Sequence, residues 1–503
     1  MNRPLATLLC LAALWSAPVL AQHNAPKEAA PDKERGEQTA ADYAAQGQAQ
    51  LQARLAMQAR TGKAKNLIIF IGDGMGVSTL TAGRIWEGQK AGRDGESNET
   101  VIDSLPYSAM VKTYSHDFQV ADSAATATAL VTGTKTRSGM LSVAPAALRG
   151  KCETAAGRDV PTLFEQAESA GKALGVISTA RITHATPAST YAHSVDRNWE
   201  SDSELPAGAA CRDIARQLVE WPHAKGLKLV LGGGRAAFMP ATQSDPEYAD
   251  KKGARKDGRD LVAEWKKKHP KGQYVWNASQ FAALNPADSA PVFGLFEPSH
   301  MQFEADRAKD KAGEPSLAEM VELAVKKLGS SEQGYVLMVE GGRIDHAHHG
   351  GNAHRALDDT VALDAAIAKV LEMVNLDETL VLVTADHSHV FTIAGYPPRG
   401  NSIFGLASIT EDGEPITAKD GKAYTTLGYA NGPGAKVNEP RADPAQEDTA
   451  ALNYLQQSLV PTLGETHGGE DVVVKAAGPQ AQLFHGTIEQ HSIYHIAKHI
   501  LGL

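Results

Sequence analysis

The stretch YVLMVEGGRIDHAHHGG, residues 335–351, decides the fold of this chain. It opens with an apolar and aromatic run, Tyr335 to Val339, and a short run that stops near a pair of glycines is typical of a buried strand. The side chains that follow and can bind a metal are Glu340, Asp345, His346, His348 and His349. Asp345 and His349 share one face of a helical turn, and a carboxylate beside an imidazole suits zinc. The alternative for this stretch alone is a solvated loop that is rich in histidine.

Three more apolar runs end in the same kind of side chain. They are residues 66–76 (NLIIFIGDGMG), 174–187 (LGVISTARITHATP) and 379–389 (TLVLVTADHSH). The polar residues near the ends of these runs are Asp73, His184, Thr186, Asp386, His387 and His389. Continuous apolar runs separated by helical segments predict an α/β fold with a mostly parallel central sheet covered by helices on both faces. Because ligands bind outside the carboxyl ends of such strands, the four runs predict one crevice that binds metal.

The amino-terminal region has the features of an exported protein. Residues 1–21 combine Arg3, a short apolar stretch and small residues before Gln22, which predicts a cleaved secretory signal peptide. That stretch is short for spanning a membrane and no other is long enough, so we expect no membrane anchor in the mature chain and a location in the periplasm or outside the cell. Residues 22–60 predict a flexible lead-in and an amphipathic helical arm, which docks either on a partner subunit or on its own domain.

The rest of the chain, residues 61–503, predicts one large domain because the strand-like runs are spread along it. Residues from about 395 to 463 are rich in Gly, Pro, Asn and Asp and predict a loop-rich insertion. The net charge is −10 and basic residues form no block, so we expect no nucleic-acid partner. Cys152 and Cys211 remain after cleavage of the signal peptide, and an isolated pair in an exported chain predicts a disulfide.

Residues 120–130, VADSAATATAL, contain the candidate nucleophile. Asp122 and Ser123 precede small residues that favour a helix, so they form either an ordinary cap or a site where Ser123 meets a bound anion. No G-x-S-x-G elbow lies nearby, which disfavours a Ser-His-Asp hydrolase and favours a serine activated by metal. Arg197 is either a surface charge or a fork for an oxyanion. Residues 227–235, LKLVLGGGR, lack the Lys-Ser/Thr of a nucleotide-binding loop, so we expect close strand–helix packing there.

Together these residues resemble the alkaline phosphatase family over most of the mature chain. The motifs that carry the resemblance are, in chain order, NLIIFIGDGMG, VADSAATATAL, VDRNW, VEGGRIDHAHH, TADHSHVF and ETHGGED. His184 and His346 stand where the enteric bacterial pattern has Asp and Lys, so the motifs are more similar to the animal-type branch. The resemblance implies a homodimeric enzyme that hydrolyses a broad range of small phosphate monoesters through a phosphoserine intermediate, with two Zn²⁺ and one Mg²⁺.

The resemblance also implies a role for each motif residue. Ser123 is the nucleophile, Arg197 clamps two phosphoryl oxygens, Asp122 orients Arg197, and His346 contacts phosphate through water. One zinc ion is held by Asp345, His349 and His467, and the other by Asp73, Asp386 and His387. The magnesium ion is held by Asp73, Thr186 and Glu340, with His184 nearby.

A further cation site is implied by three motifs of the animal-type branch, which stand here as DPEY (245–248), GLFEP (294–298) and EPSL (314–317). The implied calcium ligands are the carboxylates of Glu247, Glu297 and Glu314 and the carbonyl of Phe296, an all-oxygen set that suits Ca²⁺. Glu314 stands where the family has Asp, and the segment between Glu297 and Glu314 is longer than in the family. The alternative is a set of surface glutamates in loops.

Rival functions predict different residues around Ser123. A sulfatase on the same scaffold would need a C/S-x-P-x-R motif, whereas Ser123 is followed by Ala-Ala-Thr. A phosphodiesterase relative usually has Thr as the nucleophile and lacks the arginine clamp. A protein that only binds phosphate or metal would need neither an intact Ser123 nor both zinc sets.

Overall fold

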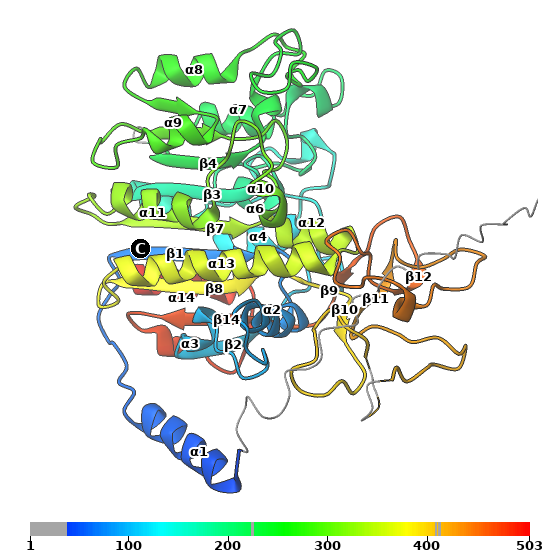
Figure 1. The fold of residues 1–503 in the computed structure, drawn as a ribbon. Coiled ribbons are helices and arrows are strands. Elements are labelled where there is room, and N and C mark those ends of the chain that lie inside the picture. The colour runs from blue at the N-terminus through cyan, green and yellow to red at the C-terminus, as the bar shows by residue number, and fades with distance from the viewer. Residues whose placement is uncertain (1–37, 223–225, 408–409, 411–413) are drawn as a thin grey trace, which may run out of the picture.

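The computed structural model describes residues 38–222, 226–407, 410 and 414–503. The strands are β1 (Asn66–Gly72), β2 (Tyr107–Lys112), β3 (Ala173–Arg181), β4 (Leu229–Gly233), β5 (Gln273–Val275), β6 (Val292–Leu295), β7 (Tyr335–Gly341), β8 (Thr379–Ala385), β9 (Ser388–His389), β10 (Phe391–Ile393), β11 (Leu427–Gly432), β12 (Ser458–Pro461), β13 (His467–Gly468), β14 (Val472–Ala477) and β15 (Thr487–Glu489). A ten-stranded sheet in the order β15-β2-β14-β8-β1-β7-β3-β4-β6-β5 forms the centre of the molecule (Figure 1).

The main sheet is parallel except at β14, which pairs antiparallel with both β8 and β2. Strands β1, β7 and β8 are adjacent, and every residue in them is buried. A strand with helices over both faces has no solvated side, which is why these segments read as unbroken apolar runs rather than as alternating patterns. The predicted α/β fold with a mostly parallel sheet is confirmed.

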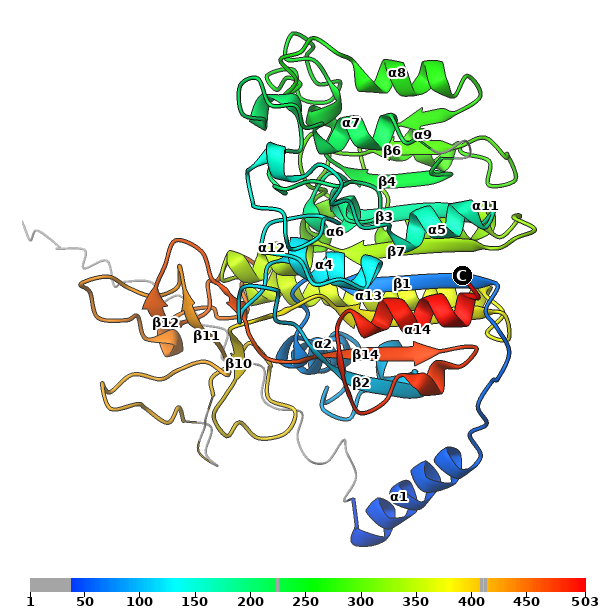
Figure 2. The same ribbon diagram turned by 180° about the vertical axis from the view of Figure 1, so that it is seen from behind.

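Helices cover both faces of the sheet. The α-helices of the described chain are α1 (Ala40–Leu55), α2 (Val77–Lys90), α3 (Val101–Ser104), α4 (Ser123–Thr132), α5 (Leu163–Ser169), α6 (Ala185–Ala188), α7 (Ile214–Val219), α8 (Leu261–Lys268), α9 (Ala278–Ala282), α10 (Glu304–Arg307), α11 (Leu317–Leu328), α12 (Arg343–His349), α13 (Ala353–Met373) and α14 (Ser492–Leu501). Figure 1 shows α11 and α13 across one face, and Figure 2 shows α5 and α14 across the other.

The register of the central strands brings the candidate ligands together. Gly72 of β1 lies beside Gly341 of β7 and Ala385 of β8, so these strands end at the same level. The chain then turns at once, and Asp73 and Asp386 are the next residues after β1 and β8. Parallel strands that end level place their following loops at one edge of the sheet, as the sequence predicts.

Helix α1 lies apart from the body of the molecule. All of its residues are exposed, and both views show it standing off the sheet (Figures 1 and 2). The predicted arm is therefore helical but does not pack on its own domain. The proposed signal peptide, residues 1–21, and most of the lead-in lie outside the described residues. None of the helices in the described part of the chain is both long and apolar enough to cross a membrane.

The segment predicted as a loop-rich insertion contributes β11 and β12, which join β10, just before the segment, in a second, smaller sheet of order β10-β11-β12. It lies at the end of the main sheet where α12 and β9 are found (Figure 1). Elsewhere, a disulfide joins Cys152 to Cys211, with 5.7 Å between their Cα atoms. At the glycines after β4, a Cβ on Gly233 would lie 2.1 Å from the Ser299 carbonyl oxygen, so the close packing expected there is against a loop rather than a helix.

Candidate metal centre

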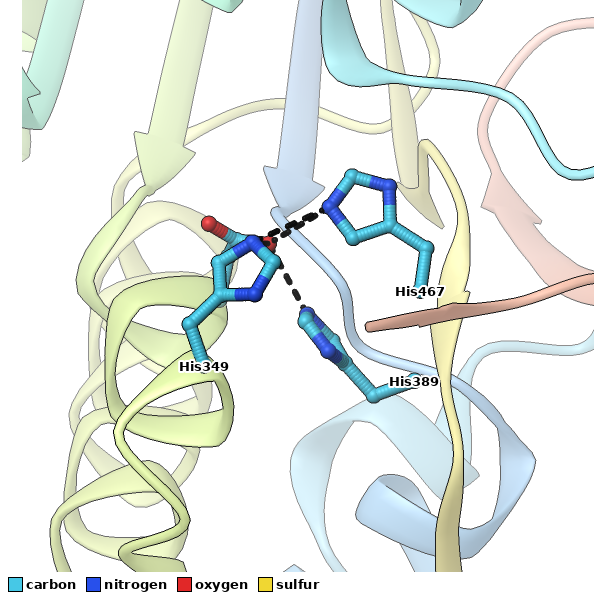
Figure 3. A group of neighbouring side chains, drawn as sticks. His349, His389 and His467 are labelled. Carbon is cyan, nitrogen blue, oxygen red and sulfur yellow. Dashed lines mark hydrogen bonds and ion pairs between the residues drawn. The ribbon is translucent and has the colours of Figure 1, made fainter. Parts of the chain in front are cut away.

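The first group of ligand-type residues is built on α12, which begins two residues after β7. Asp345 and His349 lie on one face of this helix, with 3.3 Å between Asp345 Oδ1 and His349 Nε2. His467, on β13, brings its Nε2 within 3.3 Å of the same Asp345 oxygen and 3.1 Å of His349 Nε2. The three residues that the sequence predicts for one zinc ion therefore converge (Figure 3).

Backbone carbonyls fix the protonation of the histidine rings. The Nδ1 of His349 lies 2.6 Å from the Glu465 carbonyl, that of His467 lies 2.8 Å from the Ala121 carbonyl, and that of His387 lies 3.3 Å from the Ser388 carbonyl. A carbonyl only accepts, so each ring donates from Nδ1, and in the neutral ring the Nε2 lone pair is then open to a metal. This is the arrangement by which histidines are held for a metal, and the donor set of nitrogens and one carboxylate suits zinc.

His389 joins this group in space but in a different role. It donates from Nε2 to Asp345 Oδ1 at 2.8 Å and from Nδ1 to Glu465 Oε2 at 2.5 Å. Burial opposes the charged ring, but the two carboxylates outweigh burial and raise the pKa of His389 to about 9. Because both of its ring nitrogens contact carboxylates, His389 is placed to orient Asp345. His389 was expected among the residues of the metal-binding crevice, and its position two residues after His387 on an extended segment puts both rings on one side.

Asp73, Asp386 and His387 form the second group, next to Ser123. His387 Nε2 lies 3.3 Å from Asp73 Oδ1 and 3.4 Å from Asp386 Oδ2. The Oγ of Ser123 is 3.0 Å from His387 Nε2 and 3.4 Å from Asp73 Oδ1. Asp386 is held by the backbone N–H groups of Gly74 and His387. Gly74 has φ +68°, and a Cβ there would overlap the His389 ring at 2.4 Å, so this turn requires glycine.

The residues predicted for magnesium share a feature that fits a bound cation. Buried side-chain oxygens that have no hydrogen-bond partner among the described residues include Asp73 Oδ2, Thr186 Oγ1 and Glu340 Oε1. Burial raises the pKa of Asp73 well above its usual value and that of Glu340 to about 7. A hard cation would satisfy these oxygens and keep both carboxylates ionised, so the set fits Mg²⁺.

Asp122 and Arg197 meet at the amino terminus of α4. Asp122 caps this helix and accepts a hydrogen bond from Arg197 Nη1 at 3.0 Å and another from the Gly139 N–H at 2.9 Å. Burial opposes its charge, but Arg197 and these hydrogen bonds hold the pKa of Asp122 below its usual value. Arg197 Nη2 donates to His184 Nε2 at 3.1 Å, so the neutral His184 ring carries its proton on Nδ1.

His346 is held from two sides at the edge of the centre. Arg343 Nη1 donates to His346 Nδ1 at 3.1 Å, which leaves Nε2 as the N–H donor of the ring. The ring of His300 lies 4.0 Å from that of His346, and burial lowers the pKa of His346 to about 3. The neutral ring can therefore donate one hydrogen bond from a fixed position. Sequence reasoning found neither Arg343 nor His300.

The acidic set predicted for calcium is only partly brought together. Glu247 and Glu297 converge, with one oxygen of each and one of Asp310 within 4.8 Å of one another. Asp310, which the sequence analysis did not name, joins this group. Glu314 Oε1 accepts from the Gln302 N–H at 2.8 Å, and its Oε2 is buried with no hydrogen-bond partner among the described residues. Burial raises the pKa of Glu247 to about 7, and Asp310 Oδ2 is buried without a partner. Phe296 is the first residue after β6 and is fully buried next to Glu297.

Comparisons with known proteins agree with this geometry. The family model described as alkaline phosphatase matches residues 64–503. The chain is 46% identical over 442 residues to an alkaline phosphatase of Gadus morhua, which covers 86% of this chain and 91% of that protein. It is 46% identical over 446 residues to the tissue-nonspecific isozyme of Rattus norvegicus, covering 87% and 83%. The alkaline phosphatase structure of Thermus thermophilus is 25% identical with a TM-score of 0.64 and covers 88% and 93% of the two chains. The chain therefore belongs to the alkaline phosphatase family.

Proposed function

We propose that the chain hydrolyses phosphate monoesters to an alcohol and inorganic phosphate through a phosphoserine at Ser123. The observation that carries the mechanism is the position of Ser123: its Oγ lies 3.0 Å from His387 Nε2, at the amino terminus of α4, beside both ligand groups. Membership of the family supports metal-dependent hydrolysis of phosphate monoesters, and we propose that the range of substrates is broad.

The chain's own residues account for attack and binding. Ser123 Oγ forms a bond to phosphorus while the ester oxygen leaves, and water later breaks the serine–phosphorus bond to release phosphate. Arg197, held by Asp122, presents its guanidinium to two phosphoryl oxygens, and His346 donates from Nε2 through a water molecule. Transfer of a phosphoryl group depends mainly on such positioning and on charge neutralisation.

Cations complete the centre. We assign one Zn²⁺ to Asp345, His349 and His467, a second to Asp73, Asp386 and His387, and Mg²⁺ to Asp73, Thr186 and Glu340 with His184 nearby. When bound, these ions lower the pKa of the serine hydroxyl and of water and neutralise the attacking and leaving oxygens.

The test is phosphate release from p-nitrophenyl phosphate, with and without EDTA, by the wild type and by Ser123→Ala. We expect turnover that EDTA abolishes and that zinc with magnesium restores, and labelled phosphate trapped on the wild type alone after acid quenching. Turnover by Ser123→Ala near the wild-type rate would refute the phosphoserine.

We also propose that residues 1–21 are a signal peptide removed on export to the periplasm or beyond, and that the mature chain is a homodimer. The exposure of every residue of α1 supports a role for this arm against a partner subunit. The amino-terminal sequence of the mature protein and its mass in solution test these two statements.

For the acidic set we propose Ca²⁺ held by Glu247, Glu297 and Asp310, with the Phe296 carbonyl. The buried, unpartnered oxygen of Asp310 supports this assignment. The ion would stabilise the fold without taking part in the chemistry, because it binds the native state alone.

A further inference from the structure

The molecule is hollowed beside α12. A cavity of about 320 Å³ touches His346 on this helix and is bounded on its other sides by Phe303, Asp306 and Arg355 and by Asn453 and Leu455 of the loop-rich segment. Ligand pockets usually have volumes of about 300–1,000 Å³, so this cavity has room for a small molecule.

Exposure within the centre indicates where the alcohol part of a substrate must lie. Ser123 is 2% exposed and His387 is fully buried, whereas the side chain of His349 is 37% exposed. The attacking and leaving oxygens lie roughly in line across phosphorus. A monoester that reaches Ser123 therefore keeps its leaving group on the open side, near His349.

The cavity adjoins that open side. Asp345 and His349 are four residues apart and lie on one side of α12. His346 and Gly350 have the same spacing and form a second row of residues, about 100° further round the helix axis. His346 and Gly350, the second row, line the cavity. An alcohol group that extends past His349 along the helix surface enters the cavity between α12 and the loop-rich segment.

The charges of the cavity are already paired, which excludes a second anionic group as its preferred occupant. Arg355 contacts Asp306 at 2.7 Å and donates to the Leu452 carbonyl at 3.0 Å. Asp306 also pairs with Lys309 at 2.7 Å. The ring of Phe303 is covered by the guanidinium of Arg343 at 3.6 Å, so this face is not available to stack on a nucleobase.

The remaining polar groups suit hydroxyls. Asn453 accepts from Arg355 through Oδ1 at 2.9 Å, and within the described chain its amide nitrogen makes no hydrogen bond that would compete with a ligand. Leu455 is 42% exposed and supplies a small aliphatic wall. We propose that the cavity is a leaving-group subsite that favours monoesters of polyols and sugars. This inference rests on the proposed hydrolysis of monoesters.

The test compares kcat/KM for glycerol 1-phosphate and glucose 6-phosphate with kcat/KM for ethyl phosphate, whose leaving group is too short to fill the cavity. In the metal-loaded wild type we expect the polyol and sugar esters to be preferred. Leu455→Trp fills the cavity and Asn453→Ala removes the amide, and each should lower the preference by about tenfold, the effect of about one lost polar contact. The matched control is Leu459→Trp, a substitution on β12 at a residue that is 82% exposed and outside the cavity lining.

The possible outcomes distinguish a failure of the subsite proposal from a failure of the proposed hydrolysis. A preference that falls in Leu455→Trp and Asn453→Ala but not in Leu459→Trp supports the subsite. A preference that both variants leave unchanged, or rates that fall in parallel for all three esters, overturns it. A wild type that hydrolyses none of the esters would instead refute the proposed function.

Discussion

Replacing His389 by alanine should weaken metal binding and destabilise the metal-free protein. The His389 ring lies between Asp345 and Glu465, and its side chain and that of Glu465 are fully buried while Asp345 is 4% exposed. Because the pKa of His389 is raised to about 9, the ring is cationic near neutral pH. His389→Ala leaves two buried carboxylates close together with no cation between them.

The expected magnitude follows from these contacts. Two hydrogen bonds between charged groups are lost, at about 1.5–3 kcal/mol each. Removing one partner of a buried ion pair costs about 3–5 kcal/mol, so we expect a loss of that size in the free energy of unfolding of the metal-free protein. In the metal-bound protein the metal ion balances the negative charge of Asp345. The main effect of the substitution there is a metal affinity about 10–100-fold lower, as for other groups that orient metal ligands.

Two measurements check this prediction: competition between the protein and a zinc chelator, and urea unfolding of the metal-free protein. The control is His499→Ala, which removes an exposed histidine whose Nε2 lies 3.2 Å from Gln480 Oε1. A zinc affinity within twofold of the wild type, with unchanged stability of the metal-free protein, would show that His389 does not hold Asp345 for the metal.

Three further predictions concern the other groups. Ser123→Ala should lower kcat/KM by on the order of a thousandfold or more while zinc content stays near that of the wild type, measured by elemental analysis; covalent trapping of phosphate by the variant would contradict it. Arg197→Ala should weaken inhibition by inorganic phosphate by about tenfold or more, since hydrogen bonds to a dianion are lost, and an unchanged inhibition constant would argue against the clamp. Added Ca²⁺ should raise the melting temperature of the wild type and of Glu314→Gln more than that of Asp310→Asn; equal responses in all three would exclude Asp310 as a ligand.

The sequence predicts those features that depend on local pattern. Strands β1, β7 and β8 are recognisable because buried parallel strands are apolar throughout, and the residues just after them meet because the strands end level. Asp345 and His349 share a face because of helical spacing alone.

Features that depend on tertiary contacts were missed. His389 acquires its role only because β9 pairs with β13, which brings in Glu465 from 76 residues away. Asp310 joins the acidic set from the segment between α10 and α11, at a position that none of the three motifs includes. The contact between the rings of His300 and His346 likewise joins two segments with no shared periodicity.

The same contacts explain why this centre depends on metal. Asp73, Glu340, Asp345 and Asp386 are all at most 3% exposed, and they lie at one edge of the sheet. Burial, and for Asp73 and Asp386 the neighbouring carboxylates, raise the pKa of Asp73, Glu340 and Asp386, so the protein without cations holds an electrostatically unfavourable cluster. The fully buried strands β1, β7 and β8 keep these carboxylates in place despite their mutual repulsion. The stability of the hydrophobic core therefore offsets the unfavourable electrostatic energy of the site. Binding of cations then relieves a strain that the fold has already imposed, so the ligands need little rearrangement when the metals bind.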